Sequence, residues 1–245
     1  MRLLDGVYLV GSGTIGLSAP TDCNVYVVDA GESLVMVDAG SGMAPADILD
    51  NLRADGLDPA RLSHIVLTHS HWDHVRGCRA LAAGGAAVLV HEAGRAVVEE
   101  GPYARRDVSV EPVRVSRTLT GGERLAIGRV DLEVVALPGH SLDSIAVRLV
   151  ADGRSVCFTG DTALAMGICG PTAPEDMGTL KSSVARLDAL GIDALLPGHG
   201  LFVLRGGRDH VALLDRKLRE RWYDAYVHPS PFSPAWHLAR GAAPG

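Results

Sequence analysis

Thr68-His69-Ser70-His71-Trp72-Asp73-His74 is the stretch of this sequence that decides the fold. It directly follows an apolar run at residues 65–67, which is typical of a buried strand. Three imidazoles and a carboxylate therefore stand where a strand ends and a loop begins. Neutral imidazoles and carboxylates are ligands for divalent ions such as zinc. The stretch predicts a metal site at the end of a strand.

Further candidate ligands stand beside glycines later in the chain: His140 in Pro-Gly-His-Ser, Asp161 in Thr-Gly-Asp-Thr and His199 in Pro-Gly-His-Gly. Glycine permits the tight turns that aim such side chains. With the first stretch, the candidate set is His69, His71, Asp73, His74, His140, Asp161 and His199. Seven ligands are more than one ion needs. The sequence therefore predicts two divalent metal ions per chain.

Short apolar strands alternate with helical patterns along the chain, which indicates an α/β fold. Strands are expected at residues 7–10, 24–28, 34–37, 65–67, 87–90, 132–136, 145–150 and 155–158. Helices are expected at residues 44–54, 74–83, 93–100, 179–190 and 208–226. No linker divides the chain, so we expect one domain over residues 1–205. Residues 206–245 should form a C-terminal helix and tail packed on that domain.

A weak internal repeat relates the two halves of the chain. Each half runs strand, Asp-bearing loop, helix, strand and His-bearing loop, with Asp38 and His69 in the first half and Asp161 and His199 in the second. Open α/β sheets bind ligands at the carboxyl ends of their strands. Two similar halves packed face to face would therefore bring the distant ligand loops to one edge.

In this order, and with Asp38 in Val-Asp-Ala-Gly, the motifs resemble those of the metallo-β-lactamase-fold hydrolases. The resemblance implies a four-layer αβ/βα sandwich with the metal site along one edge. It implies a first metal held by His69, His71 and His140 and a second held by Asp73, His74 and His199. Asp161 would bridge the two ions, and Asp38 would support the histidine loop without binding metal.

Asp161 also bears on the branch of the family. The β-lactamases of this fold lack the bridging carboxylate, so its presence resembles the glyoxalase II and lactonase groups. The resemblance implies hydrolysis of an ester, thioester or lactone by a hydroxide shared between the metals. Asp73 would be the catalytic residue that carries a proton to the leaving group. Zinc is the expected metal, with iron and manganese as alternatives.

The main alternative is an iron-dependent persulfide dioxygenase of the same fold, which uses one iron held by two histidines and one aspartate. This sequence retains ligands for both sites, which favours the dinuclear hydrolase. A non-catalytic scaffold would lack ligands. Glyoxalase II has a longer C-terminal region with basic residues for glutathione. A basic cluster here could mimic it or form a solvated face: Arg216, Lys217, Arg219 and Arg221. Residues beside the ligands are mostly apolar, which favours an uncharged or acyl-bearing substrate: Met43, Trp72, Ser141, Met166, Ile168 and Phe202.

Composition limits the partners. The chain is 47% hydrophobic and 21% charged with a net charge of −6, which argues against a nucleic-acid or anionic-membrane surface. It has no apolar run near the ~20 residues of a membrane span and no signal-peptide pattern at its start. The cysteines, Cys23, Cys78, Cys157 and Cys169, form no CxxC pair and predict reduced, buried thiols in a cytoplasmic protein. We expect a small-molecule substrate; a homodimer is compatible with the sequence.

Overall fold

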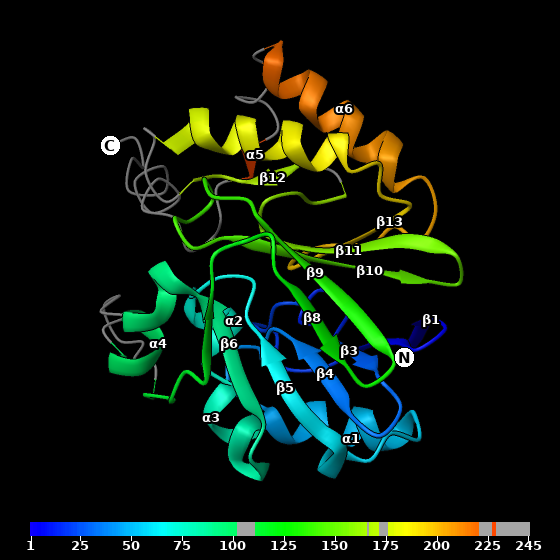
Figure 1. The fold of residues 1–245 in the computed structure, drawn as a ribbon, viewed down its shortest axis with the longest axis vertical. Helices are drawn as coiled ribbons and strands as arrows, with labels where there is room; N and C mark the ends of the chain where they lie inside the picture. The colour runs from blue at the N-terminus through cyan, green and yellow to red at the C-terminus, as the bar shows by residue number, and fades with distance from the viewer. Residues whose placement is uncertain (102–110, 166, 172–175, 221–226, 229–245) are drawn as a thin grey trace, which may run out of the picture.

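The computed structural model describes residues 1–101, 111–165, 167–171, 176–220 and 227–228, the last two by their backbone alone. Two sheets face each other, and helices cover the outer face of each (Figure 1). Helices α5 (Met177–Ala189) and α6 (Gly207–Arg219) cover one sheet, and α1 (Pro45–Ala54) and α3 (Cys78–Leu81) cover the other. The predicted α/β class and four-layer αβ/βα sandwich are confirmed.

The first sheet has seven strands in the order of the sequence. They are β1 (Arg2–Leu4), β2 (Val7–Gly11), β3 (Val25–Asp29), β4 (Leu34–Val37), β5 (Leu62–Val66), β6 (Ala87–His91) and β7 (Arg117–Leu119). Strands β1 to β4 pair antiparallel, and β4 to β7 pair parallel. The parallel part places the ends of β4 and β5 at the same edge.

The second sheet has the strand order β13-β11-β10-β9-β8. Its members are β8 (Arg124–Ile127), β9 (Val130–Ala136), β10 (Ile145–Ala151), β11 (Arg154–Gly160) and β13 (Ala194–Pro197). Only β11 and β13 pair parallel within it. A small separate pair joins β12 (Ile168–Cys169) to β14 (Val227–His228).

The predicted repeat is present as two strand–helix–strand units. In the first, β4 and β5 are parallel and α1 connects them; in the second, β11 and β13 are parallel and α5 connects them. Asp38 and Asp161 directly follow the first strand of each unit. The histidine loops follow the second strand of each unit, so both pairs of loops lie at strand carboxyl ends.

The predicted helix at residues 74–83 is wrong as one element. The chain instead forms α2 (Trp72–Val75), α3 and a 3-10 turn at Ala82–Gly84. The break lies at Gly77, whose amide donates to the carbonyl of Gly40 at 3.1 Å. A Cβ at Gly77 would stand 1.9 Å from the carbonyl oxygen of Ala39. The helix is interrupted because the Asp38–Gly40 loop packs directly against it.

The predicted helix at residues 93–100 is a 3-10 turn at Glu92–Gly94 followed by α4 (Arg95–Glu100). The one predicted at residues 208–226 is α6, which ends at Arg219; residues 221–226 lie outside the described part. The face of α6 with Val211, Leu214 and Leu218 packs into the cluster that α5 lines. The division of the chain at residue 205 stays a prediction, as does the packing of the tail over residues 229–245.

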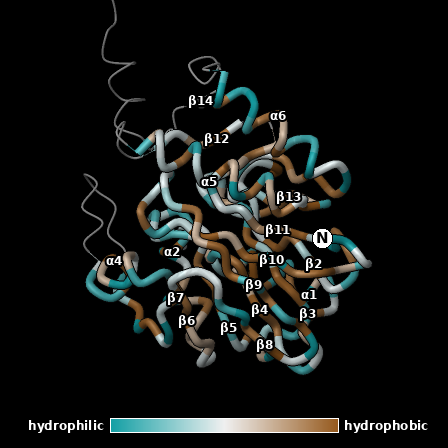
Figure 2. The backbone as a smooth tube through the Cα atoms, turned by 45° about the horizontal axis from the view of Figure 1, so that its top comes forward, coloured by the Kyte–Doolittle hydropathy of each residue, from teal (hydrophilic) through white to brown (hydrophobic). Residues whose placement is uncertain are grey.

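Apolar side chains fill three layers of contact. One cluster lies between the two sheets and includes Tyr26 and Phe158, whose ring centroids are 5.2 Å apart. The other two lie between each sheet and its helices. Figure 2 shows the corresponding hydrophobic colour along the central strands and polar colour on many of the outer loops. Burial of each large side chain stabilises the fold by roughly 1.5–3 kcal/mol, so the sheets form a rigid frame for the loops.

All four cysteines are buried and none forms a disulfide. Among the described residues, no helix combines the length and apolar character that crossing a membrane requires.

Candidate metal centre

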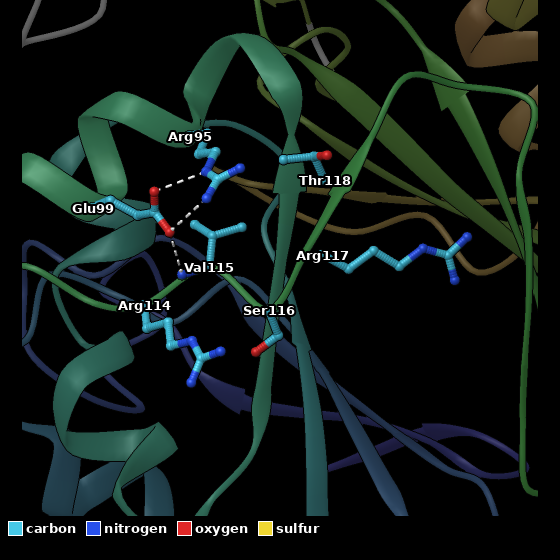
Figure 3. A pocket seen from close by; sticks show the side chains of 7 residues that line it. All are labelled: Arg95, Glu99, Arg114, Val115, Ser116, Arg117 and Thr118. Atoms are coloured by element: carbon cyan, nitrogen blue, oxygen red, sulfur yellow. Dashed lines mark hydrogen bonds and ion pairs between the residues drawn. The ribbon is translucent and has the colours of Figure 1, made fainter.

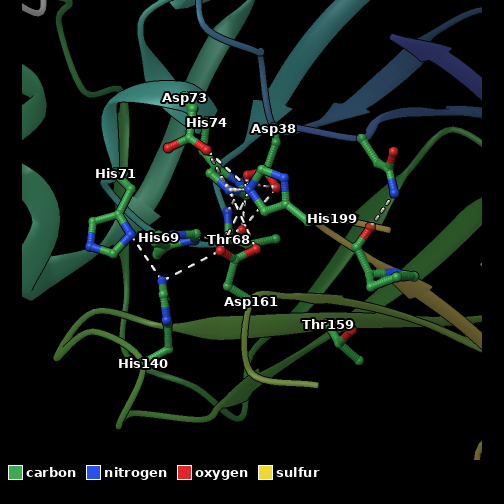
Figure 4. Close-up of polar contacts among 12 residues, drawn as sticks. Asp38, Thr68, His69, His71, Asp73, His74, His140, Thr159, Asp161 and His199 are labelled. Carbon is green, nitrogen blue, oxygen red and sulfur yellow. Dashed lines mark hydrogen bonds and ion pairs between the residues drawn. The ribbon is translucent and has the colours of Figure 1, made fainter. Parts of the chain in front are cut away.

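The seven predicted ligands converge at one edge of the sandwich (Figure 4). His69 and His71 lie in the loop after β5, and Asp73 and His74 lie on α2 directly behind them. The second sheet contributes the rest: His140 between β9 and β10, Asp161 after β11 and His199 after β13. All seven side chains come from the loops, or from the short helix α2, that follow strands β5, β9, β11 and β13.

The first group consists of His69, His71 and His140. The Nδ1 atom of His71 lies 2.9 Å from Nε2 of His69 and 2.9 Å from Nε2 of His140. Zinc–nitrogen bonds of about 2.0–2.1 Å place tetrahedral ligands roughly 3.3 Å apart. The three nitrogens are therefore close to the spacing that a single ion requires.

The second group consists of Asp73, His74 and His199. Nε2 of His199 lies 3.0 Å from Oδ2 of Asp73 and 3.3 Å from Nε2 of His74. Nε2 of His74 lies 3.9 Å from the same Asp73 oxygen. One carboxylate and two imidazoles thus face a common point, as the ligands of a second ion would.

Asp161 lies between the two groups. Its Oδ2 is 3.5 Å from Nε2 of His140 and 3.6 Å from Nε2 of His199, and its Oδ1 is 3.5 Å from Nε2 of His74. Oδ1 is buried and has no hydrogen-bond partner among the described residues. A buried, unsatisfied carboxylate oxygen is costly unless a cation or donor meets it. The donor set and this oxygen fit a pair of divalent ions.

Hydrogen bonds orient most of the imidazoles through the nitrogen that faces away from the centre. Nδ1 of His74 lies 2.9 Å from Oδ2 of Asp38, and Nδ1 of His140 lies 3.0 Å from the carbonyl oxygen of Gly170. Nδ1 of His69 lies 3.1 Å from the hydroxyl of Thr68. Such outer contacts hold the ring and leave Nε2 as the metal-facing atom.

Asp38 supports the histidine loop at several points. Its Oδ1 accepts the backbone amide of Thr68 at 2.7 Å, and the Thr68 hydroxyl lies 2.8 Å from Oδ2. The residue is buried and has a φ of +61°, the left-handed region that aspartate and asparagine tolerate better than most residues. The turn at Asp38 lets one carboxylate contact both the loop before His69 and the ring of His74.

The glycine before His199 is required by close packing. A Cβ at Gly198 would lie 2.4 Å from Oδ1 of Asp161 and 2.7 Å from Cε1 of His74. Gly160 has a φ of +50°, and a Cβ at this position would likewise lie too close to the Thr68 side chain. The ligand loops from the two halves can meet only because these positions carry no side chain.

Burial and local charge set the protonation of the centre. Burial lowers the pKa of His69 well below its usual value, and the neighbouring imidazoles lower it further. Burial also lowers the pKa of His140, although Asp161 acts in the opposite direction. Burial raises the pKa of the Asp161 carboxyl, but His199, His74 and His140 outweigh it and bring the pKa down to about 2. Neutral imidazoles beside an ionised carboxylate are the forms that bind a cation.

Asp73 and the histidines of the second group are coupled. Burial raises the pKa of Asp73, but the charge of His74 and the hydrogen bond from His199 leave it below its usual value. Burial lowers the pKa of His74 and of His199, but neighbouring groups outweigh burial and raise both: Cys23 and then the nearby carboxylates for His74, and Asp161 and Asp73 for His199. The Asp73 carboxyl is therefore ionised at neutral pH.

The predicted neighbours of the centre differ in their surroundings. Trp72 and Ile168 are buried in the apolar clusters beneath the two sheets, and Met166 lies outside the described residues. Met43 is 64% exposed on the loop after Asp38. The structure also adds contacts that the sequence pattern does not indicate. The backbone amide of Cys169 donates to the carbonyl oxygen of Asp161 at 3.4 Å, because the chain after β11 folds back beside that residue.

A separate pocket of about 470 Å³ lies between α4 and β7 (Figure 3). Arg95 in this pocket pairs with Glu99, which also accepts the amide of Val115 at 3.2 Å. The side chain of Arg117 extends away from the other labelled side chains. None of the seven candidate ligands lines this pocket, so it is not part of the metal centre.

Curated proteins with related sequences include fungal enzymes. The chain is 28% identical over 181 residues to the atrochrysone carboxyl ACP thioesterase AgnL7 of Paecilomyces divaricatus. The matched region covers 74% of this chain and 51% of that protein. It is 26% identical over 194 residues to the lactamase-like protein vrtG of Penicillium aethiopicum, covering 78% of this chain and 56% of that protein. The chain thus spans about half the length of the curated relatives it matches.

Solved structures share the fold over almost the whole chain. BJP-1, a subclass B3 metallo-β-lactamase of Bradyrhizobium japonicum, has a TM-score of 0.75 and 25% identity, with 92% of each chain covered. The model of the metallo-β-lactamase superfamily matches residues 19–199, which include all seven candidate ligands and Asp38. With the αβ/βα sandwich and the ligand groups at its edge, this match shows that the chain belongs to the metallo-β-lactamase superfamily.

Proposed function

We propose that this protein is a hydrolase that holds two divalent metal ions and cleaves a thioester, ester or lactone. The observation that carries the proposal is the position of Asp161, within 3.5–3.6 Å of ligand nitrogens from both groups and with a buried oxygen that lacks a partner. A carboxylate placed in this way can share its oxygens between two cations. The proposed ligands are His69, His71 and His140 for one ion, and Asp73, His74 and His199 for the other.

Two divalent ions in such a centre lower the pKa of water toward neutrality and polarise the carbonyl oxygen of a bound substrate. The imidazole-rich ligand set suits zinc, and iron or manganese would be held by the same residues. The proposed ligands enclose the centre on most sides, while His71 and His199 are partly exposed to solvent. A substrate would approach past these two side chains.

Asp73 is the proposed catalytic residue. Its carboxylate is buried, ionised and 3.0 Å from Nε2 of His199, at the partly exposed side of the second group. In that position it would accept a proton from the attacking water and deliver it to the leaving alkoxide or thiolate. Asp38 would take no part in bond cleavage and would keep the ring of His74 oriented.

Two observations favour an acyl thioester as substrate. The curated relatives include proteins named atrochrysone carboxyl ACP thioesterases, in Paecilomyces divaricatus and in Aspergillus fumigatus. In addition, loops that carry or adjoin proposed ligands expose large apolar side chains: Met43 at 64%, Leu142 at 78% and Leu201 at 62%. Exposed apolar groups of this size are suited to an acyl chain rather than to a highly charged substrate.

Hydrolysis of β-lactams is a second candidate, because the solved structures that match include subclass B3 metallo-β-lactamases at 25% identity. The resemblance to known families opposes it, since the β-lactamases of this fold lack a bridging carboxylate and this chain has Asp161. Oxidation of a persulfide at a single iron is the remaining alternative.

Apoprotein reloaded with zinc, iron or manganese should be tested against thioesters, lactones, aryl esters, phosphodiesters and β-lactams. We expect thioester or ester cleavage with two ions bound per chain. Asp73→Asn should abolish turnover while the circular dichroism spectrum stays unchanged. Wild-type activity in that variant, or one iron per chain with oxygen consumption on a persulfide, would rule out the proposed mechanism. Cytoplasmic location, a small-molecule substrate and homodimer formation stay predictions.

A further inference from the structure

Asn24, directly before β3, contacts the His199 loop of the opposite sheet. Its side-chain Nδ2 donates to the carbonyl oxygen of Pro197 at 2.9 Å and to that of Gly200 at 3.1 Å. Its backbone amide donates to the carbonyl oxygen of Gly198 at 2.6 Å. A single residue therefore holds the chain on both sides of His199.

Two further side chains reinforce this contact. The hydroxyl of Ser12 lies 2.6 Å from Oδ1 of Asn24, which fixes the orientation of the amide group. The hydroxyl of Tyr26 donates to the same carbonyl of Pro197 at 2.8 Å. Ser12, Asn24 and Tyr26 are each no more than 1% exposed. Because β3 and β13 belong to different sheets, these bonds join the two halves of the fold at the metal centre.

His199 depends on its backbone more than His69, His74 and His140 do. Thr68, Asp38 and Gly170 contact the outward-facing nitrogens of the other oriented rings. Among the described residues, the hydrogen bonds and ion pairs of the His199 ring are all made by Nε2, toward the centre. The loop around it is Gly198-His199-Gly200, so no flanking side chain packs to hold it. The position of the ring therefore depends on how the backbone of this loop is held. Asn24 binds three of its carbonyl oxygens, while the amides of Gly198 and Gly200 donate to the carbonyl of Gly160 and the hydroxyl of Thr14.

We propose that Asn24 is a positioning residue for the second metal ion, acting through the His199 loop. The proposal rests on the two-ion centre proposed above and adds a residue that touches neither metal nor substrate. Loss of the Asn24 side chain should free the loop around His199 and weaken the second group. The first group should be unaffected, since the hydrogen bonds of the Asn24 side chain go to Pro197, Gly200 and Ser12 and not to His69, His71 or His140.

Titration of apoprotein with Co²⁺, followed by its visible absorption spectrum, separates the two binding events. Asn24→Ala should lower the affinity for the second equivalent by about 10–100-fold, the usual effect of losing an outer contact to a metal ligand. The affinity for the first equivalent should not change. Ser12→Ala, which removes only the bond that orients the amide, should show a smaller loss at the second equivalent alone.

Asn51→Ala is the matched control. The Nδ2 of Asn51 also bridges two carbonyl oxygens, those of Val10 at 2.9 Å and Leu17 at 2.8 Å, but it contacts no loop that carries a proposed ligand. This variant should lower the melting temperature and still bind both equivalents as the wild type does.

The proposal would be overturned if a folded Asn24→Ala protein lost affinity equally for both equivalents of Co²⁺. It would also be overturned if the affinity for the second equivalent did not fall. If Asn24→Ala does not fold, unchanged binding in Ser12→Ala overturns it instead. The wild-type titration separates this proposal from the proposed function. If the wild type binds only one equivalent, both the two-ion centre and the role of Asn24 are disproved. If the wild type binds two equivalents and Asn24→Ala binds both with the same affinities, only the role of Asn24 is disproved.

Discussion

Replacement of Asp38 by asparagine should change the proton carried by His74. The backbone at Asp38 has a φ of +61°, which asparagine tolerates, so the loop should keep its shape. The backbone amide of Thr68, 2.7 Å from Oδ1, cannot rotate away. It will therefore keep its hydrogen bond to the single side-chain oxygen that asparagine has. The new amide group then faces Nδ1 of His74, which lies 2.9 Å from Oδ2 in the wild type. His74 must accept at Nδ1, and its proton moves to Nε2, the atom that faces the centre.

The size of the effect follows from the bond that is lost. A hydrogen bond to a charged group contributes about 1.5–3 kcal/mol, and a chain of this length loses roughly 2–4 °C in melting temperature per kcal/mol. Asp38→Asn should therefore lower the melting temperature of the apoprotein by about 3–12 °C. A protonated Nε2 cannot bind metal, so affinity for the second ion should fall by about 10–100-fold.

Thermal unfolding of the apoprotein and Co²⁺ titration measure the two effects. Asp22→Asn is the control, because Asp22 is also buried and accepts backbone amides, from Ser41 at 2.7 Å and Ala19 at 3.1 Å, without bonding to a histidine. It should lose stability but keep both ions. An Asp38→Asn protein with wild-type melting temperature and wild-type affinity for both ions would refute the reasoning.

Three other perturbations test the frame and the centre. Phe158→Ala removes a ring that is 1% exposed between the sheets and should cost about 3–5 kcal/mol in urea unfolding; a loss below 1 kcal/mol would mean that the sheets do not pack there. Gly198→Ala puts a Cβ 2.4 Å from the Asp161 carboxylate and should reduce the bound metal measured by elemental analysis, whereas Gly84→Ala, with nothing within 4 Å, should not. Equal metal content in both would contradict the close packing. EDTA should lower the melting temperature by about 5–16 °C for each ion removed, because one ion at 100–1,000 times its Kd contributes about 2.7–4.1 kcal/mol. Zinc should restore the melting temperature, and no change on chelation would argue against tight binding.

The long central strands were predictable because apolar runs and turn residues are local signals. The strands β1, β7 and β8 were not, because each lies at a sheet edge and has only three or four residues, which are too few for a clear period. The helix expected at residues 74–83 failed for a different reason. Its break at Gly77 depends on the approach of the Ala39 carbonyl from another part of the chain, which helical periodicity does not record.

The sequence by itself determined the superfamily, the four-layer fold and the candidate ligands. Those features depend on residue types at short spacing, such as His69 to His74 after an apolar strand, and on a repeat of the same pattern in each half. Only the tertiary structure decided how the ligands are held. Asp161 lies within 3.6 Å of nitrogens from both groups. Asn24 donates a hydrogen bond to Pro197 in the loop of His199, 173 residues further along the chain. Contacts of that range form when two sheets pack face to face, and no local pattern in the chain encodes the distance across that interface.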